Sequence, residues 1–224
     1  MKRPVRIDLM RALSNALMVN LLLFLFGACA HVAAPGTNYS GKINDGIYTN
    51  PNNTFQVQVP KLYGGTIVDK QLGIRSFRVS MVDDYCRLFA VTEISPDWEK
   101  VSFEKLVDDV GKLYEQSYGG EGSATVVEQK KIPTEFGEGL YVRRSYSTGG
   151  PCTVLTFADG KRTEGKPPAE SATINVRSGP HVYVIETMIG GSPGGQGANG
   201  GPGLTLGSLD EQMGSFFKGF RTLK

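Results

Sequence analysis

The N-terminal segment, residues 1–30, constrains this chain most. It determines the compartment in which the rest of the chain folds, and therefore whether the cysteines are in an oxidising environment. Four basic side chains lie within residues 1–11: Lys2, Arg3, Arg6 and Arg11. An apolar run follows at 16–26, and small residues dominate 27–30. This order is typical of a secretory signal peptide. The run is shorter than the roughly 20 residues that cross a bilayer, which disfavours a permanent span.

The exit from the apolar run is compatible with more than one processing route. Phe26-Gly27-Ala28-Cys29 resembles the lipobox of bacterial lipoproteins, although that family usually has Leu in place of Phe26. The resemblance implies acylation of Cys29, including palmitate, and, with Ala30 after it, an outer-membrane anchor that leaves the protein facing the periplasm. The alternatives are ordinary cleavage before His31, at a small-x-small site, and an uncleaved anchor.

The chain divides into a signal peptide at 1–29, a flexible tether at 30–45 that is rich in Ala, Pro, Gly and Ser, and one domain at 46–224. Removing residues 1–29 takes away four of 24 basic and one of 22 acidic residues, so the formal charge falls from +2 to −1. A nearly neutral domain has no basic field for nucleic acid.

The chain has three cysteines, and two of them remain for the folded domain once Cys29 is assigned to the signal peptide. Cys86 and Cys152 then form an even pair in an oxidising compartment, which favours a disulfide. Such a long closed loop corresponds to roughly 4 kcal/mol in the entropic model. The alternative is two free thiols in the core.

Hydrophobic periodicity predicts an α+β fold, in which helices pack on an antiparallel sheet. Alternating runs predict strands at 55–59, 77–81, 85–94, 124–132, 139–147, 152–157, 172–177 and 181–189, and the apolar run 182–185 is expected to be central. Apolar residues at three- and four-residue steps predict an amphipathic helix from about 103 to 118. A capping box at Ser208–Glu211 predicts a last helix, with Phe220 on its buried side.

The Gly-rich segment 190–207 has low complexity and is expected to be disordered. Residues 195–200 match a dinucleotide-binding pattern, but the next helix begins eight residues after Gly200, too late to hold a pyrophosphate. Residues 190–194 match a nucleophile elbow, but Pro193 lacks the amide that the oxyanion hole needs. We therefore predict no catalytic and no cofactor-binding residues.

Other residue pairs that suggest chemistry have simpler interpretations. Asp83 and Asp84 are interpreted as solvated turn residues rather than cation ligands. Arg143 and Arg144 suit anion recognition, but neighbours in a strand face opposite sides, so they cannot form one clamp. His181 is interpreted as a strand-end residue, and no metal-ligand spacing occurs.

Three fragments together resemble the Mog1/PsbP-like family: residues 48–60, residues 138–144, and a late strand that leads into the Phe-rich end at 216–220. The resemblance implies an antiparallel sheet sandwiched by helices over about residues 46–224. It also implies a non-catalytic binding or assembly role.

Two main function classes follow, besides a purely structural envelope protein. The first is a non-enzymatic envelope lipoprotein, anchored to the membrane by its lipid, that interacts with another envelope protein. The alternative is an envelope hydrolase or small-ligand-binding protein. A pocket that gathers Arg143 or Arg144 with acids and tyrosines would favour the alternative, whereas one exposed apolar patch would favour the first.

Overall fold

A computed structural model describes residues 39–62, 64–72, 76–83, 86–94, 102–118, 124–147, 154–158, 161–165, 169–190 and 207–223, without the side chains of 113–118, 154–158 and 161–165. These residues belong to one unit, Thr37–Lys224. The predicted signal peptide and nearly all of the Gly-rich segment lie outside them. The described part confirms the predicted α+β class, because it consists mostly of antiparallel strands with two helices.

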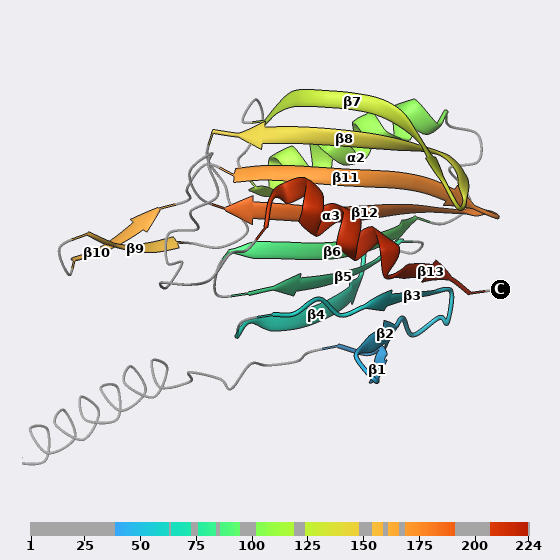
Figure 1. Ribbon diagram of the computed structural model, residues 1–224, viewed down its shortest axis with the longest axis horizontal. Coiled ribbons are helices and arrows are strands. Elements are labelled where there is room, and N and C mark those ends of the chain that lie inside the picture. Colours follow the sequence, from blue (N-terminus) through green and yellow to red (C-terminus); the bar gives the residue numbers. More distant parts are fainter. Residues whose placement is uncertain are drawn as a thin grey trace, which may run out of the picture. The chain divides into compact units, whose positions relative to one another are not determined.

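The main sheet has seven strands, and all its neighbours are antiparallel (Figure 1). Its order is β4 (Thr66–Gln71), β5 (Ser76–Val82), β6 (Arg87–Ile94), β12 (His181–Gly190), β11 (Ala169–Ser178), β8 (Gly137–Tyr146) and β7 (Ala124–Thr134). The prediction that residues 182–185 lie in a central strand is confirmed, since β12 is fourth of the seven. Every residue of β6 is buried, which is expected of a strand that is covered on both faces.

One face of this sheet packs against a second, four-stranded sheet and helix α3 (Leu209–Lys218). The small sheet consists of β1 (Lys42–Asn44), β2 (Ile47–Thr49), β3 (Phe55–Gln58) and β13 (Phe220–Thr222). Phe55 joins the two sheets, with its ring 5.9 Å from that of Tyr183 and 6.3 Å from that of Phe77. Each such fully buried side chain contributes about 1.5–3 kcal/mol.

The opposite face packs against helix α2 (Phe103–Tyr118), whose predicted bounds are confirmed. Its buried residues Leu106, Val107 and Val110 meet the even-numbered residues of two strands: Val182 and Val184 of β12, and Leu140 and Val142 of β8. The odd-numbered Tyr141, Tyr183 and Ile185 belong to the cluster on the α3 side. The two-residue period of a strand thus divides the core into two layers.

Five of the described strands, β1, β2, β4, β10 (Lys161–Gly165) and β13, lie outside the strands that the sequence predicted. β1 lies inside the expected tether of residues 30–45, because Asp45 and Gly46, both with positive φ, form a two-residue turn that pairs it with β2. β13 contains Phe220, which was expected in the last helix; Gly219 ends that helix, and β13 pairs with β3. β10 pairs with β9 (Val154–Ala158).

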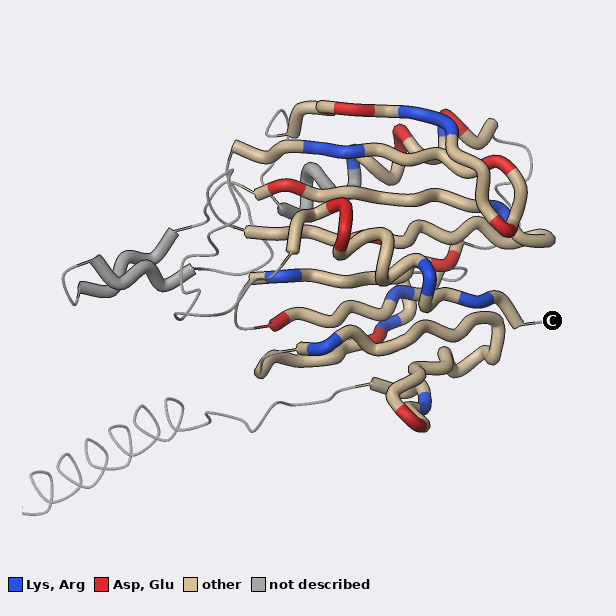
Figure 2. The backbone as a smooth tube through the Cα atoms, viewed as in Figure 1, with Lys and Arg blue, Asp and Glu red and all other residues tan. Residues whose placement is uncertain are grey.

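Charged residues of both signs are interspersed over the described strands in Figure 2 rather than gathered by sign. Neither α2 nor α3, the helices that the structure describes, has the length and apolar character needed to cross a bilayer.

Candidate functional site

Strand β8 presents its two arginines to opposite faces of the main sheet, as predicted. Arg143 lies on the α3 side, where its side chain is 30% exposed. Arg144 lies on the α2 side with only 6% of its surface exposed. The two therefore belong to different environments and are treated separately.

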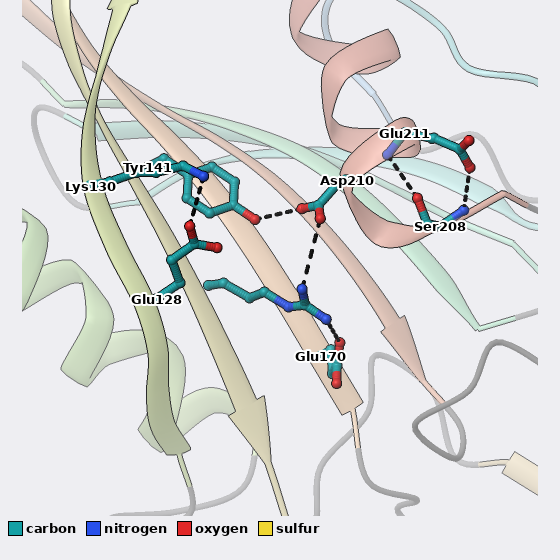
Figure 3. A network of polar contacts seen from close by, with 8 residues as sticks. Glu128, Lys130, Tyr141, Glu170, Ser208, Asp210 and Glu211 are labelled. Carbon is teal, nitrogen blue, oxygen red and sulfur yellow. Dashed lines mark hydrogen bonds and ion pairs between the residues drawn. The ribbon is translucent and has the colours of Figure 1, made fainter.

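Arg143 is held in a network of polar contacts at the start of α3. Its Nη2 donates to Glu170 Oε2 at 2.6 Å, and its Nη1 lies 3.8 Å from Asp210 Oδ2. The Tyr141 hydroxyl donates to Asp210 Oδ1 at 2.6 Å, and Figure 3 shows Tyr141 and Asp210 pointing toward one another from β8 and α3. Lys130 extends the network from β7, with Nζ 5.0 Å from the centre of the Tyr141 ring.

The electrostatics of this network match its contacts. The hydrogen bond with Glu170 raises the pKa of Arg143 further above its usual range. Burial raises the pKa of Tyr141, and the hydrogen bond to Asp210 adds to the effect, so its hydroxyl stays a donor at neutral pH. Since two carboxylates already neutralise Arg143, this arrangement fixes α3 to the sheet and offers little to a further anion.

Strand β7 forms one edge of the main sheet and carries its most exposed apolar side chains. Val126 is 54% exposed and Val127 is 58% exposed. The pairing with β8 shifts register between Val126 and Glu128, which displaces Val127 from the ladder. An open groove lies at the other end of the strand, lined by Pro133, Thr134, Glu135, Phe217, Lys218 and Arg221. The strand therefore offers an exposed apolar pair and a groove along one edge.

Glu93 and His181 form an acid–base pair that the sequence did not reveal. They lie on neighbouring strands β6 and β12, with His181 Nδ1 3.0 Å from Glu93 Oε1. The contact lacks hydrogen-bond alignment, so both buried atoms have no hydrogen-bond partner. The other carboxylate oxygen accepts from Thr54 Oγ1 at 2.9 Å and from Asn50 Nδ2 at 3.3 Å. Strand register was the missing information, since these residues are far apart in the chain.

The interpretation of Asp83 as a solvated turn residue is wrong. Asp83 is 3% exposed and forms an ion pair with Arg87, whose Nε donates to Asp83 Oδ2 at 2.9 Å. The paired arginine offsets the cost of burying this carboxylate. Asp84 lies outside the described residues.

The three cysteines are only partly described. Cys86 is in a disulfide bond and is buried, with positive φ, just before β6. Its predicted partner Cys152 and the predicted lipidation site Cys29 lie outside the described residues, so both assignments stay predictions. Among the described residues, no group of three or more His, Cys, Asp or Glu side chains could hold a metal ion.

Comparison with known proteins identifies a similar structure but no sequence relative. No family model and no curated protein matches the chain. The solved structures include a match to the solution structure of cyanobacterial PsbP (CyanoP) from Synechocystis sp. PCC 6803. The TM-score is 0.45, with 10% identity over 83% of this chain and 98% of that chain. The likeness concerns the fold, and nothing about function follows from it.

Proposed function

We propose that this protein is a non-enzymatic envelope lipoprotein that binds another envelope protein through the exposed edge of β7. The supporting observation is the pair Val126 and Val127, two exposed apolar side chains on an edge strand, since a binding module is expected to expose apolar surface. The proposed lipid on Cys29 would hold the domain at the membrane surface, facing the periplasm.

The geometry of β7 suits an extended segment of a partner. An edge strand has unpaired backbone groups along its outer side, and a partner segment can pair with them. Charged side chains on an edge strand discourage pairing with another chain. On β7 they lie only in the second half, where Lys130 pairs with Glu128 and Lys131 with Glu138. The first half, Ala124–Val127, carries no charge. We therefore place the contact at the first half of the strand.

Site-specific photo-crosslinking in intact cells tests this proposal. A photoreactive amino acid at position 127 should give one discrete adduct with a second envelope protein, and Val126→Asp should abolish it. The matched control places the same probe at Val68, a 38% exposed valine on the opposite edge strand β4. The same adducts from both positions, or none from position 127, would contradict the proposal.

The alternative, an envelope hydrolase, is favoured by one observation, the closeness of Glu93 and His181. A carboxylate beside an imidazole can support general acid–base catalysis. Purified protein should then turn over a chromogenic ester, phosphate or glycoside substrate, and His181→Gln should abolish turnover while Lys130→Gln leaves it unchanged. Absence of turnover across such a panel, or equal activity of the His181 variant, would exclude this use of the pair.

A further inference from the structure

Arg144 is a buried arginine with no carboxylate partner among the residues that the structure describes. It is 6% exposed and makes no hydrogen bond or ion pair with any residue that the structure describes. Burying most of a guanidinium without a counter-charge carries a desolvation cost. Its neighbour Arg143 has two carboxylates at a more exposed position. Among the residues whose side chains the structure describes, none forms an ion pair with Arg144.

Two described acids on this side of the sheet pair with other basic residues. Glu186 binds Arg78 Nη2 through Oε2 at 2.8 Å, while its buried Oε1 has no hydrogen-bond partner. Asp108 of α2 pairs with Lys112 at 2.9 Å, and its side chain is 66% exposed. The hydrogen bond from Lys112 is the main cause of the lowered pKa of Asp108, and Arg144 is the last of its named causes. Neither acid forms an ion pair with Arg144.

The surroundings of Arg144 leave room for the guanidinium and supply hydroxyl groups. A Cβ at Gly111 of α2 would lie 2.5 Å from Arg144 Nη2, so only glycine permits this approach. Ser171 lies opposite Arg144 in the β8–β11 pairing and is fully buried. Its Oγ lies 3.5 Å from the Tyr146 hydroxyl, also buried. A guanidinium beside hydroxyl donors is the chemistry that recognises an oxyanion.

We propose that Arg144, with Ser171, forms a binding site for a small carboxylate or phosphate group between β8, β11 and α2. The planar fork of the guanidinium would bind two oxygens of the anion, and the serine hydroxyl would donate to one of them. Arg144 lies opposite Val126 in the β7–β8 pairing, so this site adjoins the β7 edge, whereas Arg143 projects to the opposite face of β8.

Thermal unfolding of the purified full-length protein in sodium phosphate or sodium acetate tests the site, with sodium chloride at matched ionic strength as the reference. We expect a saturable rise in Tm of roughly 3–5 °C at a tenfold excess over Kd in at least one of the two anions. Phosphate alone would indicate a phosphoryl ligand, and acetate alone a carboxylate. Arg144→Gln should lose the response, whereas Arg143→Gln should keep it. Equal responses in chloride, or a response retained by Arg144→Gln, would overturn the proposal.

A second pair of variants covers the case in which Arg144→Gln does not fold. Gly111→Ala should displace the guanidinium and weaken anion binding at least tenfold. Gly214→Ala is its matched control, because it also replaces a helical glycine but has nothing within 4 Å of the added methyl group. Unchanged anion binding by Gly111→Ala would also overturn the proposal.

Discussion

Asp69 of β4 accepts hydrogen bonds at the point where the chain enters the folded domain. The Ser40 amide donates to Asp69 Oδ1 at 2.8 Å, and the Gly41 amide donates to Oδ2 at 2.9 Å. The buried hydroxyl of Tyr48 also donates to Oδ2. Burial alone would raise the pKa of Asp69, but these hydrogen bonds outweigh it and lower the pKa. One carboxylate thus fastens residues 40–41 to the edge of the main sheet.

The lowered pKa of Asp69 predicts loss of stability in acid. Because the folded state binds this proton less readily than the unfolded state, the contribution of Asp69 is complete above its ordinary pKa and disappears as the pH falls through its folded pKa. Urea unfolding at pH 7, 5 and 3 should show that Asp69→Asn is less stable than wild type at pH 7, with a difference that shrinks toward pH 3.

Asp45→Asn is the control for this series, because Asp45 lies in the β1–β2 turn and its side chain accepts no hydrogen bond from the described residues. It should leave the pH dependence unchanged. A difference between Asp69→Asn and wild type that stays constant from pH 7 to pH 3 would show that the carboxylate charge is not what stabilises the contact.

Single residues were the hardest scale to predict from the sequence. The side-chain orientation of Arg143 and Arg144 follows from the two-residue period of a strand. The burial of Asp83 does not follow from this period, because it depends on how a turn closes. The closeness of Glu93 to His181 does not follow from it either, because it depends on which strands become neighbours. The local sequence pattern does not determine the register between distant strands. The residues of the candidate site therefore could not be brought together from the sequence alone.

Among the elements, helix α3 is the one whose start the sequence specifies most clearly. Its predicted capping box is confirmed: the Glu211 amide donates to Ser208 Oγ at 3.2 Å, and the Ser208 amide donates to Glu211 Oε2 at 2.7 Å. The helix places Leu209, Met213 and Phe216 in the core. The cap therefore contributes directly to the packing of that face.

Ser208→Ala should lower the free energy of unfolding by about 1 kcal/mol, because it leaves an amide of the first turn without its acceptor. Equilibrium urea unfolding measures the change. Ser215→Ala, at an exposed position in the middle of the same helix, should have no effect or stabilise slightly. A loss of the same size in both variants would show that the cap is not responsible.

The elements that escaped prediction are short and depend on pairing. β1 and β13 have three residues each, too few for a period to be recognised. The turn Asp45-Gly46 was the available signal for the first, since that dipeptide favours a two-residue hairpin. Long periodic elements such as α2, β8 and β12 were predictable because a whole apolar face repeats within each.

At the scale of the whole molecule, an exported and lipid-anchored domain is the claim on which the other proposals depend. A disulfide at Cys86 requires an oxidising compartment, which export would provide. The proposed contact at the β7 edge requires the domain to be held near the membrane, which the lipid anchor would provide. The disulfide at Cys86 is compatible with export. The anchor itself is proposed from the resemblance of residues 26–29 to a lipobox.

The most direct test is the intact mass of the membrane-extracted protein, measured with and without reductant in wild type and in Cys29→Ala. We expect a mature chain that begins at Cys29 and carries a diacyl or triacyl increment, and we expect Cys29→Ala to lose that increment. Reduction should add about 2 Da if Cys86 pairs with Cys152. A soluble product that begins at His31, with no acyl increment, would contradict the account and leave a freely diffusing secreted domain.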